Sequence, residues 1–540
     1  MDYDAVLQHL GESGAYQRRL AILLSLIGIP AGLHVGAMTF IAAIPDHHCR
    51  MPQTTPAGFN LTLPAALNMS IPLEEVEGAQ RLSRCRRYDV TDQFGWLNST
   101  TTTSTCTDGW EYDQSQYHSS IVSQYDLVCD RAWLREMAQS IFMAGVGLGG
   151  IVFGFMSDRF GRHVTLMTCL LLQLTFGVSA AFTSNLVTFA ILRFLVGAVS
   201  NGAYYAGFVI GTVQENNRRE IYLHNQNISW RYEVPEHLFS LFPYARFLSE
   251  SPRWLIFAKK TDEARKVIER IAKENGVSLS QETFEKLNGC AKVQQEQTTP
   301  SNRSRKYSVI DLVRTPQMRK ITLAMNVAWL ISVCVYYSLM LGTSQLVGDH
   351  YVNFVLGACV EIVAMFVAWV TMDRWGRKRP FIIFIFVAGV SCLAAAGVPH
   401  DLGVITTTFA MAGRFGISIG FCTLTVYSAE VFPTVIRNMG VGQASMVSRL
   451  GGVMAPFIGL LGNVWRPLPL LMYGVLSCVA GAAVTVLPET HGISLPNTPE
   501  DLECLARRLS IPSAAKCPDE TESATKSSDE TAVYEMVSSL

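Results

Sequence analysis

The chain has 540 residues and a formal net charge of −1 at pH 7, with 16% charged and 49% hydrophobic residues. Soluble domains usually carry about 25% charged residues, so the composition argues against an ordinary soluble protein. The near-zero net charge gives no indication of a nucleic-acid partner. No metal-ligand spacing, phosphate-binding loop or catalytic triad stands out, so we expect neither an enzyme nor a cofactor. Coupling to Na⁺ or H⁺ stays open.

Residues 1–19 are polar and lack the early apolar stretch of a cleavable signal peptide, so the first apolar run is expected to stay in the mature protein. Ten apolar runs are long enough to cross a bilayer core of about 30 Å as helices. Helices are the expected spanning form because backbone groups find no water partners in lipid. The predicted spans are 20–44, 136–157, 164–184, 186–212, 321–343, 350–372, 379–399, 402–426, 439–463 and 467–487.

A long polar loop, 45–135, follows the first span and has the marks of an extracellular segment. It holds four of the thirteen cysteines, Cys49, Cys85, Cys106 and Cys129. An even set in one loop predicts two disulfides, and four cysteines allow three pairings. Three glycosylation sequons lie in the same loop, at Asn60, Asn68 and Asn98.

The connections 158–163 and 373–378 and the segment 253–320 are rich in Arg and Lys. The positive-inside rule places them in the cytosol, which agrees with an extracellular loop 45–135 and puts both termini in the cytosol. Within the predicted cytosolic loop 250–320 we expect a solvated helix over 261–272, stopped by Gly276. The tail 488–540 turns polar from about residue 497 and is predicted to be largely disordered.

One motif occurs twice, at corresponding places in the two parts of the chain. Both copies read D-R-x-G-R followed by a basic residue. The first copy consists of Asp158, Arg159, Gly161 and Arg162, with Gly154 before it, and the second of Asp373, Arg374, Gly376 and Arg377. A second pair of segments also stands at corresponding places: Glu250 to Arg253 ends the first part and Pro488 to Thr490 ends the second. Repeats in corresponding positions of two halves are typical of transporters.

We predict that the repeated motif gates the cytosolic side. Glycine lets two helices turn sharply, and the aspartate can sit against a helix N-terminus or an arginine and hold that side shut. The simpler interpretation is that the basic residues only set topology. Two copies in register favour gating.

The repeat also carries a family resemblance. The pattern G-x-x-x-D-R-x-G-R over 154–162 is similar to the loop signature of the major facilitator superfamily, and the second copy lacks its first glycine, where Trp369 stands. The cysteine-containing segments 106–112 and 126–130, the E-S-P-R motif at 250–253 and the segment 427–438 resemble the organic cation, carnitine and organic anion transporters. The resemblance covers about 1–212 and 250–495 and implies an all-α, polytopic major facilitator fold of two six-helix halves, in the plasma membrane. It also implies gating roles for Glu430 and Arg437.

The segment 213–249 departs from that family. Helices 5 and 6 belong there, but the segment is too short for two spans, each of about 20 residues, and it contains many charged residues. Helices 5 and 6 are therefore predicted to be missing or replaced. This leaves open a transport-incompetent variant with only a binding or regulatory role. A sugar-porter-like carrier is a further alternative, because sugar porters share several of these motifs.

Ionisable residues inside spans are functional candidates because their burial in lipid is costly. Glu361 and Arg449 lie in the middle of their spans. By the resemblance, Arg449 stands where anion and carnitine carriers have arginine, so it is expected to attract a carboxylate, and Glu361 is expected to hold a cationic group; a direct pair between the two stays open. Arg193 and Arg414 are expected to be structural. Four aromatic residues are candidates for cation–π contact with ammonium groups: Tyr204, Tyr205, Tyr336 and Tyr337.

We therefore expect an alternating-access transporter of small organic ions, whether cations, carnitine-like zwitterions or anions, with the substrate and the lipid bilayer as partners. The substrate, the coupling ion and the oligomeric state do not follow from these residues.

Overall fold

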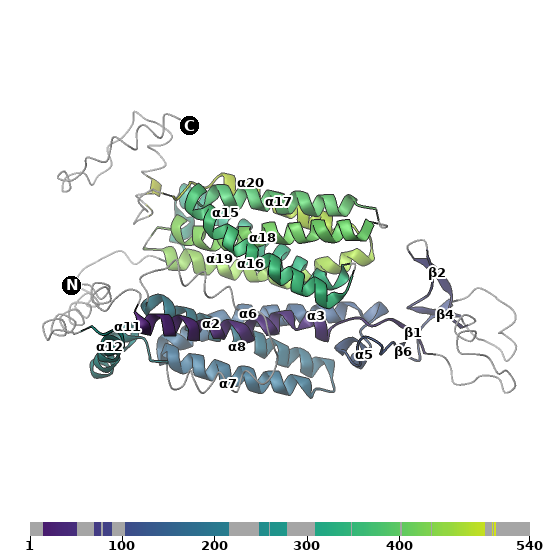
Figure 1. Cartoon of the computed structure of the whole chain (residues 1–540), viewed down its shortest axis with the longest axis horizontal. Helices are drawn as coiled ribbons and strands as arrows, with labels where there is room; N and C mark the ends of the chain where they lie inside the picture. The colour runs from purple at the N-terminus through teal and green to yellow at the C-terminus, as the bar shows by residue number, and fades with distance from the viewer. Residues whose placement is uncertain are drawn as a thin grey trace, which may run out of the picture.

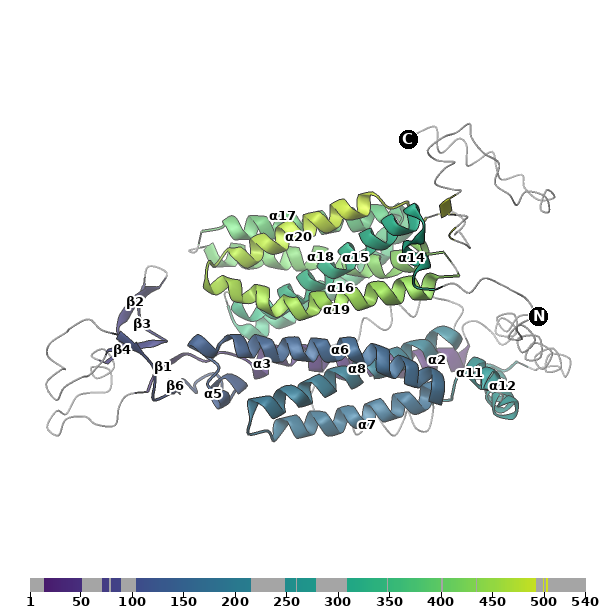
Figure 2. The ribbon, with the colours of Figure 1, turned by 180° about the vertical axis from the view of Figure 1, so that it is seen from behind.

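The computed structural model shows two helical bundles lying side by side, one built from the N-terminal part of the chain and the other from the C-terminal part (Figures 1 and 2). It describes residues 14–50, 70–76, 79–88, 103–214, 248–258, 260–277, 308–346, 348–399, 402–433, 435–491, 499 and 502–503. The loop with the disulfides extends from one end of the bundles, here called the disulfide end. The repeated D-R-x-G-R turns lie at the other end, here called the motif end.

The first bundle consists of α2 (Ala15–Gly36), the short α3 (Met38–Ile41), α6 (Trp133–Phe160), α7 (Arg162–Ala181) and α8 (Leu186–Gln214). Helices α2, α6 and α7 all pack against α8. Glycines permit the closest approach, since a Cβ at Gly145 or Gly149 of α6 would collide with a backbone carbonyl oxygen of α8. These two positions therefore set the spacing at the centre of the bundle.

The second bundle consists of six long helices: α15 (Pro316–Leu341), α16 (His350–Trp375), α17 (Lys378–Gly397), α18 (Gly403–Val431), α19 (Arg437–Leu460) and α20 (Leu468–Thr485). Helix α17 packs on α18 and α20, and α15 packs on α19. Contact between the bundles runs mainly along α6 and α19. Side chains of α6 and α19 therefore form most of the contact surface between the two bundles.

Within the described residues, nine helices are long and apolar enough to span a membrane. They coincide with nine of the ten predicted spans. The first predicted span, 20–44, is present as α2 and α3, which meet at Ala37. Helix α2 begins at Ala15, so the helix extends into the predicted polar N-terminus.

The predicted connections 158–163 and 373–378 are shorter than expected. Only Gly161 separates α6 from α7, and only two residues, Gly376 and Arg377, separate α16 from α17. The reason is backbone geometry, because Gly161 and Gly376 have φ of +106° and +85°, a region open mainly to glycine. Each motif therefore lies largely within the two helices that it joins.

The disulfide end is an assembly of three short two-stranded antiparallel sheets and helical turns. Strand β1 (His47–Cys49) pairs with β6 (Trp110–Tyr112), β2 (Leu73–Val76) with β3 (Ala79–Leu82), and β4 (Arg86–Tyr88) with β5 (Thr103–Thr105). The four cysteines form two disulfides, Cys49–Cys106 and Cys85–Cys129. This selects one of the three pairings that the sequence allowed.

Helix α5 (Ile121–Tyr125) and the 3₁₀ turn η1 (Cys129–Arg131) lead from these strands back to α6. The hydroxyl of Tyr112 on β6 donates to Asp126, at 2.9 Å. Burial, followed by the Asp126 carboxylate, raises the pKa of Tyr112. The hydrogen bond ties the strands to the helical turn.

At the motif end, α11 (Pro252–Phe257) leads into α12 (Thr261–Asn275), and α14 (Asp311–Arg314) precedes α15. The helix predicted at 261–272 is confirmed, with Gly276 as its C-cap at φ +70°. The prediction that it is solvated is wrong. Its apolar face, including Ile268 and Ile271, packs against α2, and Arg19 pairs with Glu274 at 2.9 Å.

Several predicted features lie outside the described residues. These are the sequons at Asn60, Asn68 and Asn98, residues 215–247 of the anomalous segment, and most of the tail.

Candidate functional site

Arg449 of α19 lies at the contact between the two bundles. Its guanidinium Nη2 donates to the Tyr205 hydroxyl of α8 at 3.3 Å, and that hydroxyl lies 3.1 Å from Ser445 Oγ on α19. A Cβ at Gly147 of α6 would stand 3.4 Å from the Arg449 side chain, so a glycine leaves room beside it. Among the described residues, Arg449 hydrogen-bonds a phenol and no carboxylate, so no hydrogen-bonded acid there neutralises its charge.

Aromatic rings continue from Arg449 on both sides. The Tyr204 and Tyr205 rings meet edge to face, with their centroids 5.9 Å apart. On the other side, Tyr337 of α15 is an electrostatic neighbour of Arg449 and meets Tyr336 edge-on at 5.4 Å. The ring of Tyr336 in turn stacks on Phe421 of α18. All four predicted tyrosines therefore belong to one cluster formed by both bundles.

Glu361 of α16 reaches the same cluster from the far side. Its carboxylate is a neighbour of Tyr336 and lies 3.5 Å from the Arg414 guanidinium of α18. Arg414 also donates to Thr343 Oγ1 at 3.1 Å. Both charged side chains are buried, with 4% of Glu361 and 2% of Arg414 exposed. The alternative of a direct pair between Glu361 and Arg449 is wrong, because the partner of Glu361 is Arg414.

Arg193 of α8 has the structural environment that was predicted for it. Its guanidinium donates twice to the His34 carbonyl oxygen at 3.2 Å and once to Gln139 Oε1 at 3.3 Å. It also lies over the Phe142 ring. Arg193 thus links α2, α6 and α8 within the first bundle.

The six predicted substrate residues form a connected path from Tyr204 to Glu361. Arg449 with its tyrosine neighbours lies toward one end, and the Glu361–Arg414 ion pair lies at the other. The rings of Tyr336 and Tyr337 lie between them. A small solute with a carboxylate would be attracted to Arg449, and aromatic faces hold ammonium groups by cation–π attraction. The Glu361 carboxylate pairs with Arg414, whereas Arg449 hydrogen-bonds only neutral groups among the described residues.

At the motif end of the first bundle, Glu250 caps the start of α7. Its two carboxylate oxygens accept from the backbone N–H groups of Arg162 and His163, each at 3.0 Å. Acidic groups at a helix N-terminus satisfy orphan N–H donors and the helix dipole. Arg162 pairs with Asp158 at 2.8 Å, and Trp254 donates to the Asp158 carbonyl oxygen.

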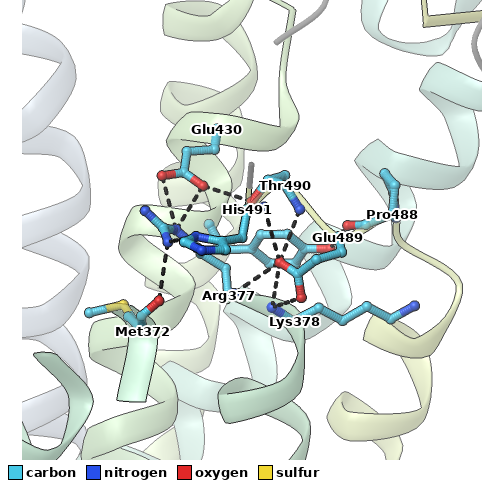
Figure 3. Close-up of polar contacts among 9 residues, drawn as sticks. Met372, Arg377, Lys378, Glu430, Pro488, Glu489, Thr490 and His491 are labelled. Atoms are coloured by element: carbon cyan, nitrogen blue, oxygen red, sulfur yellow. Dashed lines mark hydrogen bonds and ion pairs between the residues drawn. The ribbon is translucent and has the colours of Figure 1, made fainter. Parts of the chain in front are cut away.

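The second bundle repeats this arrangement around Glu489 (Figure 3). The Glu489 carboxylate accepts from the backbone N–H groups of Arg377 at 2.9 Å and Lys378 at 3.2 Å, at the start of α17. Arg377 pairs with Glu430 at 3.0 Å, and Glu430 also accepts from Thr490 Oγ1. Glu250 and Glu489 thus make equivalent contacts, as the repeat predicted.

Among the described residues, the contacts of each motif network lie within one bundle, so each network stabilises the motif end of its own bundle. Asp373 and Arg374 are exposed, and Arg159 lies over the adjacent Phe160 ring. The Arg253 side chain lies outside the described residues, while Arg437 donates to the Phe432 carbonyl oxygen at 3.4 Å. Gating by these residues stays a prediction.

Sequence reasoning did not identify Gln139 or Trp254 as partners in these networks, and it named Arg414 and Thr490 without their partners. All four enter the sites from helices or segments far away in the chain. No local spacing links Arg414 to Glu361, since they lie on α18 and α16. The position of Arg414 inside an apolar span predicted a structural role for it, but not which residue it pairs with.

Comparison with known proteins places the chain in a family. The family model "Sugar (and other) transporter" matches residues 87–208 and 199–502. The Organic cation transporter protein of Drosophila melanogaster is 36% identical over 540 residues, covering 94% of this chain and 96% of that protein. Solute carrier family 22 member 3 of Mus musculus is 34% identical, covering 93% of this chain and 96% of that protein. The chain belongs to the solute carrier 22 family. Organic cation/carnitine transporter 2 of Mus musculus is 33% identical, covering 92% of this transporter and 93% of its own length.

A solved structure supports the fold of this transporter. The xylose transporter XylE from E. coli, in an inward open conformation, superposes with a TM-score of 0.55 over 91% of this chain and 99% of that chain, at 15% identity. At that identity the likeness concerns the fold alone. The predicted all-α major facilitator fold and the predicted family are confirmed. The chain is a multi-pass membrane transporter, and its relatives favour this over the sugar-porter-like and transport-incompetent alternatives.

Proposed function

We propose that this transporter carries small organic ions with a carboxylate, either organic anions or carnitine-like zwitterions, and that Arg449 recognises the carboxylate. The observation that carries the proposal is the position of Arg449 between the bundles, held by the Tyr205 hydroxyl at 3.3 Å. Arginine matches carboxylates with a planar fork of donors. The name of one relative includes carnitine, a zwitterion with a carboxylate, which supports a solute that Arg449 can recognise.

The direction of the chain in the membrane is part of the proposal. Disulfides form in oxidising compartments, so the pairs Cys49–Cys106 and Cys85–Cys129 support an extracellular disulfide end. The Arg- and Lys-rich turns then face the cytosol, with both termini, in the plasma membrane. Transport would proceed by alternating access, with the bundles rocking about the contact between α6 and α19.

Charge selectivity in cells tests this function. Cells that express the chain are expected to accumulate labelled benzoate and carnitine above mock-transfected cells, and tetraethylammonium less, because Arg449 attracts carboxylates and repels cations. Each uptake is measured with and without sodium, which also shows whether sodium is the coupling ion. Preferential uptake of tetraethylammonium, with benzoate and carnitine at the mock level, would contradict the proposal.

A further inference from the structure

The short helix α14 and the turn before it carry an exposed apolar surface at the motif end of the second bundle (Figure 2). Val309, Ile310 and Val313 are exposed by 59%, 73% and 47%. Hydrogen bonds from the N–H groups of Leu312 and Val313 to the carbonyl oxygens of Val309 and Ile310 continue the helical turns through this stretch. Positions i, i+1 and i+4 lie on one side of such turns, so the three side chains form one patch, here called the α14 patch.

The opposite side of α14 is fixed to the second bundle. Leu312 is buried, and its carbonyl oxygen accepts from Thr322 Oγ1 of α15 at 2.8 Å. Asp311 accepts from the Ser308 N–H at 2.8 Å. Thr315, between α14 and α15, has an extended backbone, so α14 is a separate turn of helix rather than the start of α15. The α14 patch therefore points away from the bundle, and its aliphatic side chains favour an apolar environment.

Two exposed cations, Arg319 and Lys320, lie beside the patch in the first turns of α15. Arg319 Nε donates to the Val313 carbonyl oxygen at 3.3 Å, which places this guanidinium at the end of α14. Neither cation forms an ion pair within the part of the chain that the structure describes. Both are therefore available to an anion that reaches the patch.

The acidic groups nearby do not cancel these charges. Asp311 lies 3.6 Å from Arg314, a third cation. Glu503 accepts from the Gln317 N–H at the N-terminus of α15, at 2.8 Å, where the helix dipole favours an acid. Three cations and two acids leave an excess of one positive charge at this end of α15.

Leu323 of α15 shows the depth at which the two cations lie. Its side chain is 65% exposed, and α15 is one of the helices that can span a membrane, so Leu323 faces the lipid tails. Arg319 and Lys320 precede it by four and three residues, so all three share one side of the helix. The cations lie one turn, about 5.4 Å, nearer the motif end, at the level of the lipid headgroups.

We propose that the α14 patch, Arg319 and Lys320 together bind an anionic phospholipid of the surrounding bilayer. The three aliphatic side chains would enter the boundary between headgroups and acyl chains, as the apolar faces of interfacial helices do. The two cations would hold the phosphate and carboxylate of a headgroup such as that of phosphatidylserine. Placing this lipid in the cytosolic leaflet rests on the proposed direction of the chain, whereas the contact itself does not.

The test uses purified full-length protein in detergent, titrated with dioctanoyl phosphatidylserine or with dioctanoyl phosphatidylcholine. A ligand of the folded state raises the melting temperature, so the lipid concentration that gives a fixed rise reports affinity. Phosphatidylserine is expected to act at a concentration about tenfold lower than phosphatidylcholine. The double variant Arg319→Gln/Lys320→Gln is expected to need about tenfold more phosphatidylserine, and Ile310→Asn several-fold more.

The double variant Lys266→Gln/Lys273→Gln is the matched control. It removes the same charge from exposed positions of α12, also at the motif end, and α12 has no exposed large hydrophobic side chain among its described residues. The control is expected to respond to phosphatidylserine like the parent protein. If the loss of the Arg319 hydrogen bond prevents folding, Lys320→Gln alone is expected to need about three times more phosphatidylserine.

Three results would overturn the lipid site. These are an equal response to phosphatidylserine in the parent and in the folded variants of the site, an equal loss in the α12 control, and equal responses of the parent to the two lipids. The titration reads lipid binding and not solute uptake, so its failure is distinct from a failure of the proposed function.

Discussion

Replacing Arg449 by alanine is expected to lower uptake of benzoate and carnitine by about 30-fold or more. Truncating one partner of a buried charge pair costs about 2–5 kcal/mol, and about 1.4 kcal/mol corresponds to a factor of ten. The protein itself is expected to persist, because Arg449 hydrogen-bonds the Tyr205 hydroxyl and its loss leaves no buried carboxylate of the described residues without its partner. Initial uptake rates, divided by the amount of transporter labelled at the cell surface, measure the effect.

Two further variants separate charge from shape at this position. Arg449→Lys keeps the charge but loses the planar fork, so uptake is expected to fall to an intermediate level. Tyr205→Phe removes the hydroxyl that holds the guanidinium and is expected to raise KM for benzoate more than it lowers the maximal rate. Full carboxylate uptake by Arg449→Ala at normal surface level would show that the carboxylate is recognised elsewhere.

Replacing Gly161 by alanine is expected to destabilise the folded transporter strongly, whereas Gly154→Ala is expected to be tolerated. Gly161 has φ +106°, where a side chain costs about 1–3 kcal/mol, and its Cβ would lie 2.5 Å from Glu250 Oε2. The change therefore disturbs both the turn and the carboxylate that caps α7. Nothing lies within 4 Å of a Cβ at Gly154, although the same motif contains both glycines.

Thermal unfolding of the purified variants and their surface levels measure this difference. Gly376→Ala is expected to behave like Gly161→Ala, since its φ is +85° and its Cβ would lie 2.9 Å from Glu489. A loss of 1–2 kcal/mol changes cellular abundance several-fold, so the surface level should fall clearly. Equal melting temperatures for Gly161→Ala and Gly154→Ala would refute the strained turn as the reason for the glycine.

The spans were predictable because burial in lipid demands long apolar runs, which are a local property of the sequence. The helix boundaries at the motifs were harder to predict, because Gly161 and Gly376 allow connections of only one or two residues. The docking of α12 was missed for a related reason. Its apolar face was visible in the sequence, but its partner α2 is far away in the chain.

The candidate site was predicted residue by residue rather than as an arrangement. Charges and aromatic residues inside spans identified Arg449, Glu361 and the tyrosines, since such positions are costly in lipid. Their contacts depend on how the helices pack, so Arg414 as the partner of Glu361 could not be read from spacing. The equivalence of Glu250 and Glu489 was predictable, because an internal repeat places equal residues in equal surroundings.

The most direct test of the account is uptake by the purified chain in proteoliposomes, where no other transporter contributes. The account predicts saturable accumulation of labelled benzoate that exceeds the accumulation in vesicles with Arg449→Ala by about 30-fold or more. Uptake by the folded, correctly inserted chain that is no greater than in protein-free vesicles would contradict it.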